Sequence, residues 1–221
     1  MDSQNKTTYS QLPILPEPTL RRLPWYLAYL NTLRSQDVEY VSTTRIADDL
    51  KVAPSQIAKD LSFLGLRGKT RIGYAVAELE ESLRCFLGFS QRHNAIMVGT
   101  GSLGAALIAD SGLQRYGLNI VAGIDTNESL IGSSISNVCI YAPDELAALV
   151  RNLKITIGIV AVPVDSAQSV TDALVAAGIQ AVWNFTPTRI AVPDGVVITN
   201  TSIYSHLAVM YNRMSNLEHM L

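Results

Sequence analysis

The chain of 221 residues has few cysteines, few aromatic side chains and little charge, and it contains no long apolar run. Its two cysteines, Cys85 and Cys139, lie far apart and outside any metal-ligand spacing. This excludes a disulfide framework and indicates two structural thiols in a reducing compartment. No apolar run reaches the roughly 18 residues that a membrane span needs, and the polar segment 1–8 lacks the apolar core of a signal peptide. We therefore expect a cytoplasmic protein that has no membrane partner.

Side chains that could perform acid–base, nucleophilic or metal chemistry are equally scarce. We expect His93 in a linker and both His206 and His219 in a terminal helix, so none would serve as the proton relay that a dehydrogenase needs. The chain has no Cys/His cluster typical of a metal site and no nucleophile elbow. Tyr116 and Tyr141 could act as acids, but ordinary packing explains them as well. We predict no catalytic residue and no metal, and hence a binding protein that is not an enzyme.

Charge is distributed unevenly along the chain, although the net charge is only −2. Residues 1–92 hold 12 Lys and Arg against 10 Asp and Glu, whereas residues 93–221 hold 5 against 9. Within 45–74 there are 6 basic and 3 acidic side chains, so the net charge hides a basic patch. The basic members are Arg45, Lys51, Lys59, Arg67, Lys69 and Arg71. The length fits one large or two small domains.

The first half of the chain has the pattern of short helices. After a lead that contains Pro13, Pro16 and Pro18, apolar residues at three- and four-residue steps predict a helix over 19–34. The hydroxyls of 42–44 are typical N-caps for a second helix that ends near Leu50. Pro54 suits the first turn of a third helix, over 54–64, because its missing N–H would have no partner there.

The second and third helices, joined by the short connection 51–53, form a helix-turn-helix pattern. In 65–76, glycines flank alternating basic and apolar residues, which predicts a β-hairpin wing. Solvated surface explains any one of the polar side chains here, but the order helix, turn, helix, basic hairpin favours a surface for double-stranded DNA. The candidate DNA-binding residues are Thr43, Thr44, Arg45, Ser55, Gln56, Lys59, Lys69 and Arg71.

The second half alternates strand and helix patterns. Strands separated by helical stretches of roughly 10 to 15 residues are typical of βαβ units, which build a parallel, doubly wound sheet. The predicted strands are 95–99, 118–125, 155–162, 179–185 and 196–199, and the predicted helices are 102–113, 143–153 and 164–177. We therefore predict an α/β protein with a winged helix-turn-helix domain, a Rossmann domain and a C-terminal helix.

The C-terminal segment has a heptad-like apolar seam. Its members follow a 4-3-4-3-4 spacing and are Ile203, Leu207, Met210, Met214, Leu217 and Leu221. A helix with such a seam needs a partner surface. The spacing alone fits a helix that packs back on its own sheet and one that reaches a second subunit equally well.

The loop Gly99-Thr100-Gly101-Ser102-Leu103-Gly104 follows a predicted strand and opens a predicted helix. In that setting Gly99 would permit a tight turn, Gly101 would let the backbone approach a pyrophosphate, and Gly104 would let helix and strand pack closely. The pyrophosphate would lie at the helix N-terminus, where unpaired N–H groups and the helix dipole favour anions. The alternative is a glycine turn without a ligand.

Asp125 lies 21 residues past Gly104, at the end of the next predicted strand. There its carboxylate would accept hydrogen bonds from the adenosine ribose and repel a 2′-phosphate, so the sequence predicts NAD(H) rather than NADP(H). A solvated aspartate is the alternative. Thr126 or Asn127 could also cap a helix here, which does not exclude the ribose role, and Thr126 is expected to contact the dinucleotide. Val162 and Pro163 end a later strand beside the topological switch point, where contact with the dinucleotide is expected, although Pro163 also serves simply to end a strand.

Several motifs in this order resemble the Rex family of redox-sensing transcriptional repressors over nearly the whole chain. They are 22–26 (RLPWY), 55–62 (SQIAKDLS), 68–74 (GKTRIGY), 98–104 (VGTGSLG), 125–129 (DTNES) and 183–187 (WNFTP). The resemblance implies a homodimer in which each terminal helix inserts between the two domains of its partner. It also implies binding to operator DNA when NAD⁺ predominates and release when NADH rises.

The resemblance also implies that three segments of the chain have separate functions. Residues 1–90 would bind DNA, residues 91–200 would bind NAD(H), and residues 201–221 would hold the dimer together. Ser55, Gln56 and Lys59 resemble the recognition helix, and the wing that enters the adjacent minor groove would comprise Lys69, Arg71 and Tyr74.

Four positions depart from what the family commonly carries. Ala58 stands where a basic residue is common, Asp110 where Tyr is common, and Ser202 where Asp is common, while Ala28 replaces a basic residue that would pair with that Asp. The last three changes fall in the set of residues expected to couple NADH binding to DNA release.

Two alternative hypotheses for the function remain. One is an NAD-dependent oxidoreductase with a helical cap. The other is a CoA-binding or purely structural relative, against which the ribose role of Asp125 argues.

Overall fold

A computed structural model describes residues 15–66 and 68–218 of the chain. Pro13, Arg67, His219 and Leu221, all named in the sequence predictions, lie outside the described residues, as does the side chain of Leu217. The chain forms two compact units, Met1–Gln91 and Arg92–Leu221, each described separately below. Among the described residues no helix has the length and apolar character to cross a membrane.

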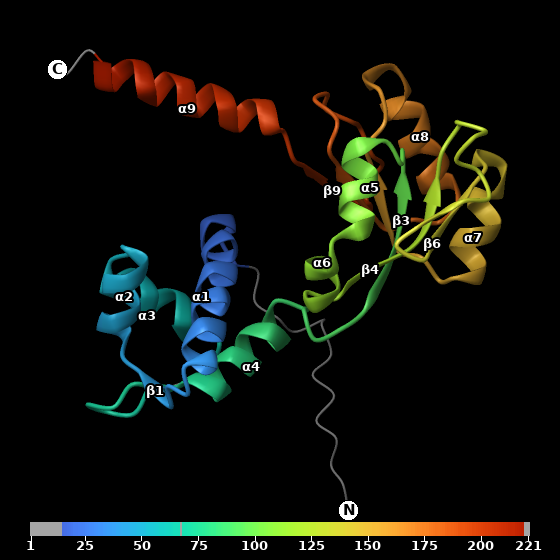
Figure 1. Cartoon of the computed structure of the whole chain (residues 1–221). Helices are drawn as coiled ribbons and strands as arrows, with labels where there is room; N and C mark the ends of the chain where they lie inside the picture. The colour runs from blue at the N-terminus through green and yellow to red at the C-terminus, as the bar shows by residue number, and fades with distance from the viewer. Residues whose placement is uncertain (1–14, 67, 219–221) are drawn as a thin grey trace, which may run out of the picture. The chain divides into compact units, whose positions relative to one another are not determined.

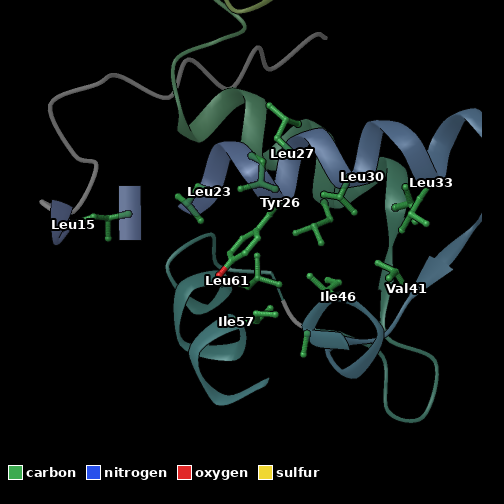
Figure 2. Packing of buried hydrophobic residues seen from close by; sticks show 14 residues of the cluster. Leu15, Leu23, Tyr26, Leu27, Leu30, Leu33, Val41, Ile46, Ile57 and Leu61 are labelled. Carbon is green, nitrogen blue, oxygen red and sulfur yellow. The ribbon is translucent and has the colours of Figure 1, made fainter. Parts of the chain in front are cut away.

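The first unit is a small helical domain whose core lies between α1 and the other helices (Figure 1). Its elements are α1 (Glu17–Ser35), β1 (Tyr40–Val41), α2 (Thr43–Leu50), α3 (Pro54–Ser62), β2 (Tyr74–Ala75) and α4 (Val76–Phe86). Figure 2 shows Leu23, Tyr26 and Leu27 of α1 in one cluster with Ile57 and Leu61 of α3. The apolar stripe that predicted the first helix is therefore the face that packs on the helix-turn-helix.

The helix-turn-helix has the predicted caps. The hydroxyl of Ser42 accepts a hydrogen bond from the backbone N–H of Arg45 at 3.1 Å and so caps α2. Lys51 has a left-handed backbone, with φ of 55°, and ends that helix before Pro54 begins α3. The third helix is shorter than predicted, since it ends at Ser62 and leaves Leu64 half-buried in the turn that follows.

The predicted wing hairpin is only partly correct. Among the described residues of 65–76, the two limbs pair only at Lys69 and Gly73, which exchange two backbone hydrogen bonds of 2.8 Å each. The strand β2 pairs instead with β1, which the sequence did not predict. Gly73 has φ of +100°, and a Cβ there would overlap the carbonyl of Val41. The wing is thus a tight loop whose base is held against the start of α2.

The second unit is a seven-stranded sheet in the order β5-β6-β4-β3-β7-β8-β9. All neighbouring strands are parallel except the short edge pair β5–β6. The strands are β3 (His93–Val98), β4 (Leu118–Ile124), β5 (Ser134–Ile135), β6 (Val138–Tyr141), β7 (Ile157–Val160), β8 (Ala181–Asn184) and β9 (Val197–Asn200). From β3 the chain first builds outward to β6 and then returns to the other side of β3, which confirms the predicted doubly wound topology.

Helices cover both faces of this sheet (Figure 1). On one face, α7 (Leu146–Asn152), preceded by the 3-10 turn η2 (Pro143–Glu145), and α8 (Val164–Ala176) pack on Ile96 and Val98. On the other, α5 (Ser102–Ala109) and α6 (Ser111–Arg115) pack on Ala95 and Met97. Because alternate residues of β3 are buried on opposite faces, this strand is the centre of the domain.

Two predictions for this unit are wrong in detail, and some elements of the chain were missed. The helix expected over 102–113 is broken after Ala109, because Asp110 has an extended backbone and caps α6 through a 2.7 Å hydrogen bond from the N–H of Gly112. His93 is not in a linker but is the first residue of β3. The strands β5 and β6, and the helix α4 of the first unit, were not predicted at all.

The terminal helix α9 (Ile203–Glu218) leaves much of its apolar seam exposed. Met210 and Met214 are 47% and 53% exposed, Ile203 is exposed, and Leu207 is half-buried. One of the two interpretations of the seam required these side chains to pack on the sheet of the same chain, and they do not.

Candidate functional site

The carboxyl edge of the sheet holds a pocket of about 460 Å³. It lies where β3, β4 and β7 end, which is the point at which the strand order changes direction. Of the residues predicted to meet a ligand, it brings together Gly99, Gly101, Asp125, Thr126, Val162 and Pro163. Apolar side chains that the sequence did not single out complete the wall, among them Leu146 of α7 and Val170 of α8.

The three glycines of the loop after β3 differ in the structural reason for which glycine is needed. Gly99 has φ of +88°, and a Cβ there would overlap the carbonyl of Ala161 at the end of β7. A Cβ on Gly104 would overlap the carbonyl of Gly99, so α5 reaches β3 this closely only with glycine. A Cβ on Gly101 would meet no protein atom within 4 Å. Packing within the chain therefore requires glycine at 99 and 104 but not at 101.

The carboxylate of Asp125 is fixed by three hydrogen bonds. Its Oδ2 accepts from both the backbone N–H and the hydroxyl of Thr100, each at 2.7 Å, and its Oδ1 accepts from the N–H of Asn127 at 2.9 Å. Partial burial alone would raise the pKa of Asp125, but these hydrogen bonds outweigh it and hold the pKa below its ordinary value. The group is thus ionised and oriented at the rim of the pocket, with acceptor capacity left for a further donor.

The remaining loop residues have distinct places. Thr100 is buried, and its side chain turns to Asp125 rather than to the pocket. Ser102 is the first residue of α5, and Leu103 is exposed beside it. The N-terminus of α5 therefore offers its backbone N–H groups at the mouth of the pocket, which is the arrangement that binds a phosphate.

The first unit presents its predicted nucleic-acid residues on α2, α3 and the wing. The exposed members are Thr44, Arg45, Ser55, Lys59, Lys69 and Arg71, and the half-buried ones are Thr43, Gln56 and Tyr74. Lys69 Nζ lies 5.2 Å from the ring centroid of Tyr40, which orients this wing cation. Lys59 and Arg71 form no ion pair with any described residue.

A buried carboxylate that the sequence reading missed ties α3 to α1. Asp60 is fully buried and accepts hydrogen bonds from Thr19, Arg22 and Tyr26 of α1 and from Gln56 of its own helix, at 2.7–3.1 Å. Burial alone would raise the pKa of Asp60, but these bonds outweigh it and lower the pKa. Burial, followed by the hydrogen bond to Asp60, raises the pKa of Tyr26 to about 12. The sequence did contain one indication that Asp60 is buried, because it lies between Ile57 and Leu61 on the apolar face of α3.

The positions that depart from the family pattern have simple structural roles. Asp110 caps α6, as described above, and the hydroxyl of Ser202 accepts from the N–H of Ser205 at 3.2 Å at the start of α9. Ala28 and Ala58 are exposed. Among the described residues no group of three His, Cys, Asp or Glu side chains could hold a metal ion.

Two family models match the chain. One is described as "Putative DNA-binding protein N-terminus" and covers residues 14–62, and the other is described as "CoA binding domain" and covers residues 90–188. The first match lies within the first structural unit, and the second covers part of the second unit and begins two residues before it.

Similar proteins span almost the full length. The redox-sensing transcriptional repressor Rex of Porphyromonas gingivalis is 51% identical, over 92% of this chain and 93% of its own. That of Bacteroides fragilis is 46% identical, over 97% of this chain and 98% of its own. The solved structure of RSP with β-NAD⁺ and operator DNA is 34% identical, with a TM-score of 0.89 over 94% of this chain and 96% of that one.

RSP is described as a Rex-family repressor, and its structure with β-NADH matches with a TM-score of 0.84 over 94% of this chain and 98% of that one. The likeness thus covers both units, the glycine loop and the helix-turn-helix. The chain belongs to the Rex family of redox-sensing transcriptional repressors.

Proposed function

We propose that this protein is a transcriptional repressor that binds operator DNA and leaves it when NADH occupies the pocket of the second unit. The observation that carries the proposal is the presence, in one chain, of a basic helix-turn-helix and a dinucleotide-type pocket. The Rex-family repressor RSP has been solved with NAD⁺ and operator DNA and with NADH. The relatives of this chain are named as repressors. This favours a dinucleotide that acts as a regulatory ligand over one that is a cofactor of a catalysed reaction.

In the nucleotide-binding domain, residues 91–200, the dinucleotide would lie across the carboxyl edge of the sheet. Its pyrophosphate would accept hydrogen bonds from the N-terminus of α5, and Gly101 would leave room for it. The ionised Asp125, held by Thr100, would accept from a ribose hydroxyl and repel a 2′-phosphate, so the ligand is NAD(H). The contact residues proposed are Gly99, Thr100, Gly101, Ser102, Leu103, Gly104, Asp125, Thr126, Val162 and Pro163.

In the DNA-binding domain, residues 1–90, α3 would enter the major groove and the wing would reach the adjacent minor groove. The exposed cations Lys59 and Arg71, which no described carboxylate neutralises, are suited to phosphate oxygens. The Asp60 hydrogen bonds would hold α3 in a fixed orientation on α1. The contact residues proposed are Thr43, Thr44, Arg45, Ser55, Gln56, Lys59, Lys69, Arg71 and Tyr74.

Residues 201–221 would join two copies into a homodimer. The exposed Ile203, Met210 and Met214 of α9 form an apolar face that needs a partner surface. We infer a domain-swapped arrangement, in which each α9 packs on the other subunit, and a cytoplasmic location, because a repressor must reach its operator.

The experiment that tests the proposal is selection of duplexes from a randomised DNA pool, repeated in NAD⁺ and in NADH. The proposal predicts one enriched sequence class in NAD⁺ that NADH displaces. The Asp125→Ala variant should enrich the same sequences but resist displacement, because it keeps the DNA-binding surface and loses the ribose contact. Enrichment that is the same in both nucleotides would contradict the regulatory part of the proposal, and no enrichment at all would contradict DNA recognition.

A further inference from the structure

The loop 185–188 follows β8 at the same carboxyl edge of the sheet as the pocket and lies beyond the residues that line the pocket. This inference rests on the proposed function. In the proposed function, Asp125 would direct the adenosine toward β4, and the N-terminus of α5 would hold the pyrophosphate beside β3. The nicotinamide half would then continue in the opposite direction, over β7 and β8. With strands about 4.8 Å apart, β8 lies about 10 Å from β3, which is within the reach of a ribose and its ring.

One fully buried side chain, Asn184, fixes this loop from the last position of β8. Its Oδ1 accepts from the backbone N–H of Thr186 at 2.8 Å and from the hydroxyl of Thr186 at 2.7 Å. Its Nδ2 donates to the carbonyl of Thr188 and to Oδ1 of Asn200, both at 2.8 Å. Both donors and both acceptor sites of the amide are used, so 186 and 188 are held to β8 and to the neighbouring β9.

The residues beside Asn184 form a rigid aromatic step at the same edge. The rings of Trp183 and Phe185 lie 4.7 Å apart between centroids, and the indole N–H of Trp183 donates to the hydroxyl of Thr201 at 2.8 Å. The backbone N–H of Phe185 donates to the carbonyl of Val160 at the end of β7. The loop is therefore anchored on three strands, and the two rings have a fixed position beside the path expected for the nicotinamide half.

We propose that Asn184 is a positioning residue for the nicotinamide half of the dinucleotide, and that it acts by fixing the loop 185–188. It has no role toward the adenosine half, which Asp125 and Thr126 would meet after β4, three strands away from β8 with β3 and β7 between them. The ligand class that distinguishes these roles is an adenosine diphosphate that ends in ribose, with or without a nicotinamide ring.

The test measures the affinities of NADH and of ADP-ribose for the full-length Asn184→Asp variant by calorimetry. The substitution keeps the shape of the side chain and removes both donors, so a carboxylate faces the carbonyl of Thr188. We expect NADH affinity to fall by about tenfold or more, equivalent to ~1.4 kcal/mol, and ADP-ribose affinity to stay within about twofold. The milder Thr186→Val variant, which removes one hydroxyl donor to Asn184, should show the same split with a smaller effect and serves if Asn184→Asp does not fold.

A matched control is Asn94→Asp, the same exchange at a half-buried amide at the amino end of β3, where Nδ2 donates to the carbonyl of Leu153. It should leave both affinities unchanged. Parallel losses for NADH and ADP-ribose in Asn184→Asp or Thr186→Val would show a general structural role and overturn the inference, as would two unchanged affinities. Wild-type protein that binds neither ligand would instead overturn the proposed function itself, and the inference with it.

Discussion

Replacing Gly101 by alanine separates the requirements of folding from those of ligand binding. Gly101 has a backbone that alanine readily adopts, with φ of −62° and ψ of −165°. The added Cβ meets no protein atom within 4 Å. Restricting the unfolded chain favours alanine by about 0.4–1 kcal/mol, but Gly101 is the N-cap of α5, where alanine is less favourable than glycine by a comparable amount. We therefore expect the stability to stay within about 1 kcal/mol of wild type. Packing around Gly101 gives no reason for glycine, whereas the close approach of a ligand does.

The expected loss of affinity follows from the contacts at the N-terminus of α5. A methyl group at 101 would displace the pyrophosphate from this helix end and disrupt two or more hydrogen bonds to a charged group. At about 1.5–3 kcal/mol each, the loss is ~3–6 kcal/mol, or roughly 10²- to 10⁴-fold in Kd. Calorimetric titration with NADH measures this, and chemical denaturation of the same sample measures stability.

A matched control is Gly104→Ala, whose Cβ would overlap the carbonyl of Gly99. This variant should lose stability as well as NADH binding, because α5 can no longer pack on β3. Gly101→Ala protein that is as stable as wild type and binds NADH with an unchanged Kd would refute the placement of the pyrophosphate.

Three further predictions concern the first unit and the C-terminal helix. Asp60→Asn should destabilise the protein by about 3–5 kcal/mol at pH 7. Because the pKa of Asp60 is lowered by folding, its contribution is present above about pH 4 and is lost on acidification; a wild-type-to-mutant difference that stays constant in urea unfolding from pH 7 to pH 3 would count against it. Lys59→Ala and Arg71→Ala should each weaken operator binding and reduce the salt slope by about one, and variants with the wild-type slope would show that these cations do not contact phosphate. Deletion of 203–221 should give monomers in sedimentation, and a truncated protein that stays dimeric would refute the dimer role of α9.

The periodic parts of the fold could be predicted from the sequence because their signals are local. The apolar stripe of α1, the Ser42 cap of α2 and the glycine loop after β3 each depend on residues a few positions apart. The break at Asp110 was missed because an aspartate within an apolar run competes as a helix cap, and its 2.7 Å bond to the N–H of Gly112 favours a new start. The strand β1 was missed because its pairing depends on β2, more than 30 residues away.

Site residues could be predicted where the ligand requires a fixed spacing along the sequence. They could not be predicted where their role depends on contacts made by tertiary packing. Asp125 followed from its distance to the glycine loop, but two of the three hydrogen bonds that orient it come from Thr100, whose side chain had no distinguishing pattern. Asp60 and Asn184 are fully buried polar groups, and apart from Gln56 on the helix of Asp60 their partners come from other elements or from the turn after the strand. No sequence period predicts such a partner, so these roles required the structure.

The redox-sensing function requires linkage between NADH binding and DNA binding. This linkage is tested directly by measuring the Kd of NADH for free and for operator-bound protein, and the Kd of the operator with and without saturating NADH. Linkage predicts that the operator weakens NADH binding by the same factor by which NADH weakens operator binding, and that this factor is at least about fivefold. A factor of one in both measurements would show that the two sites are independent and would contradict the redox-sensing function.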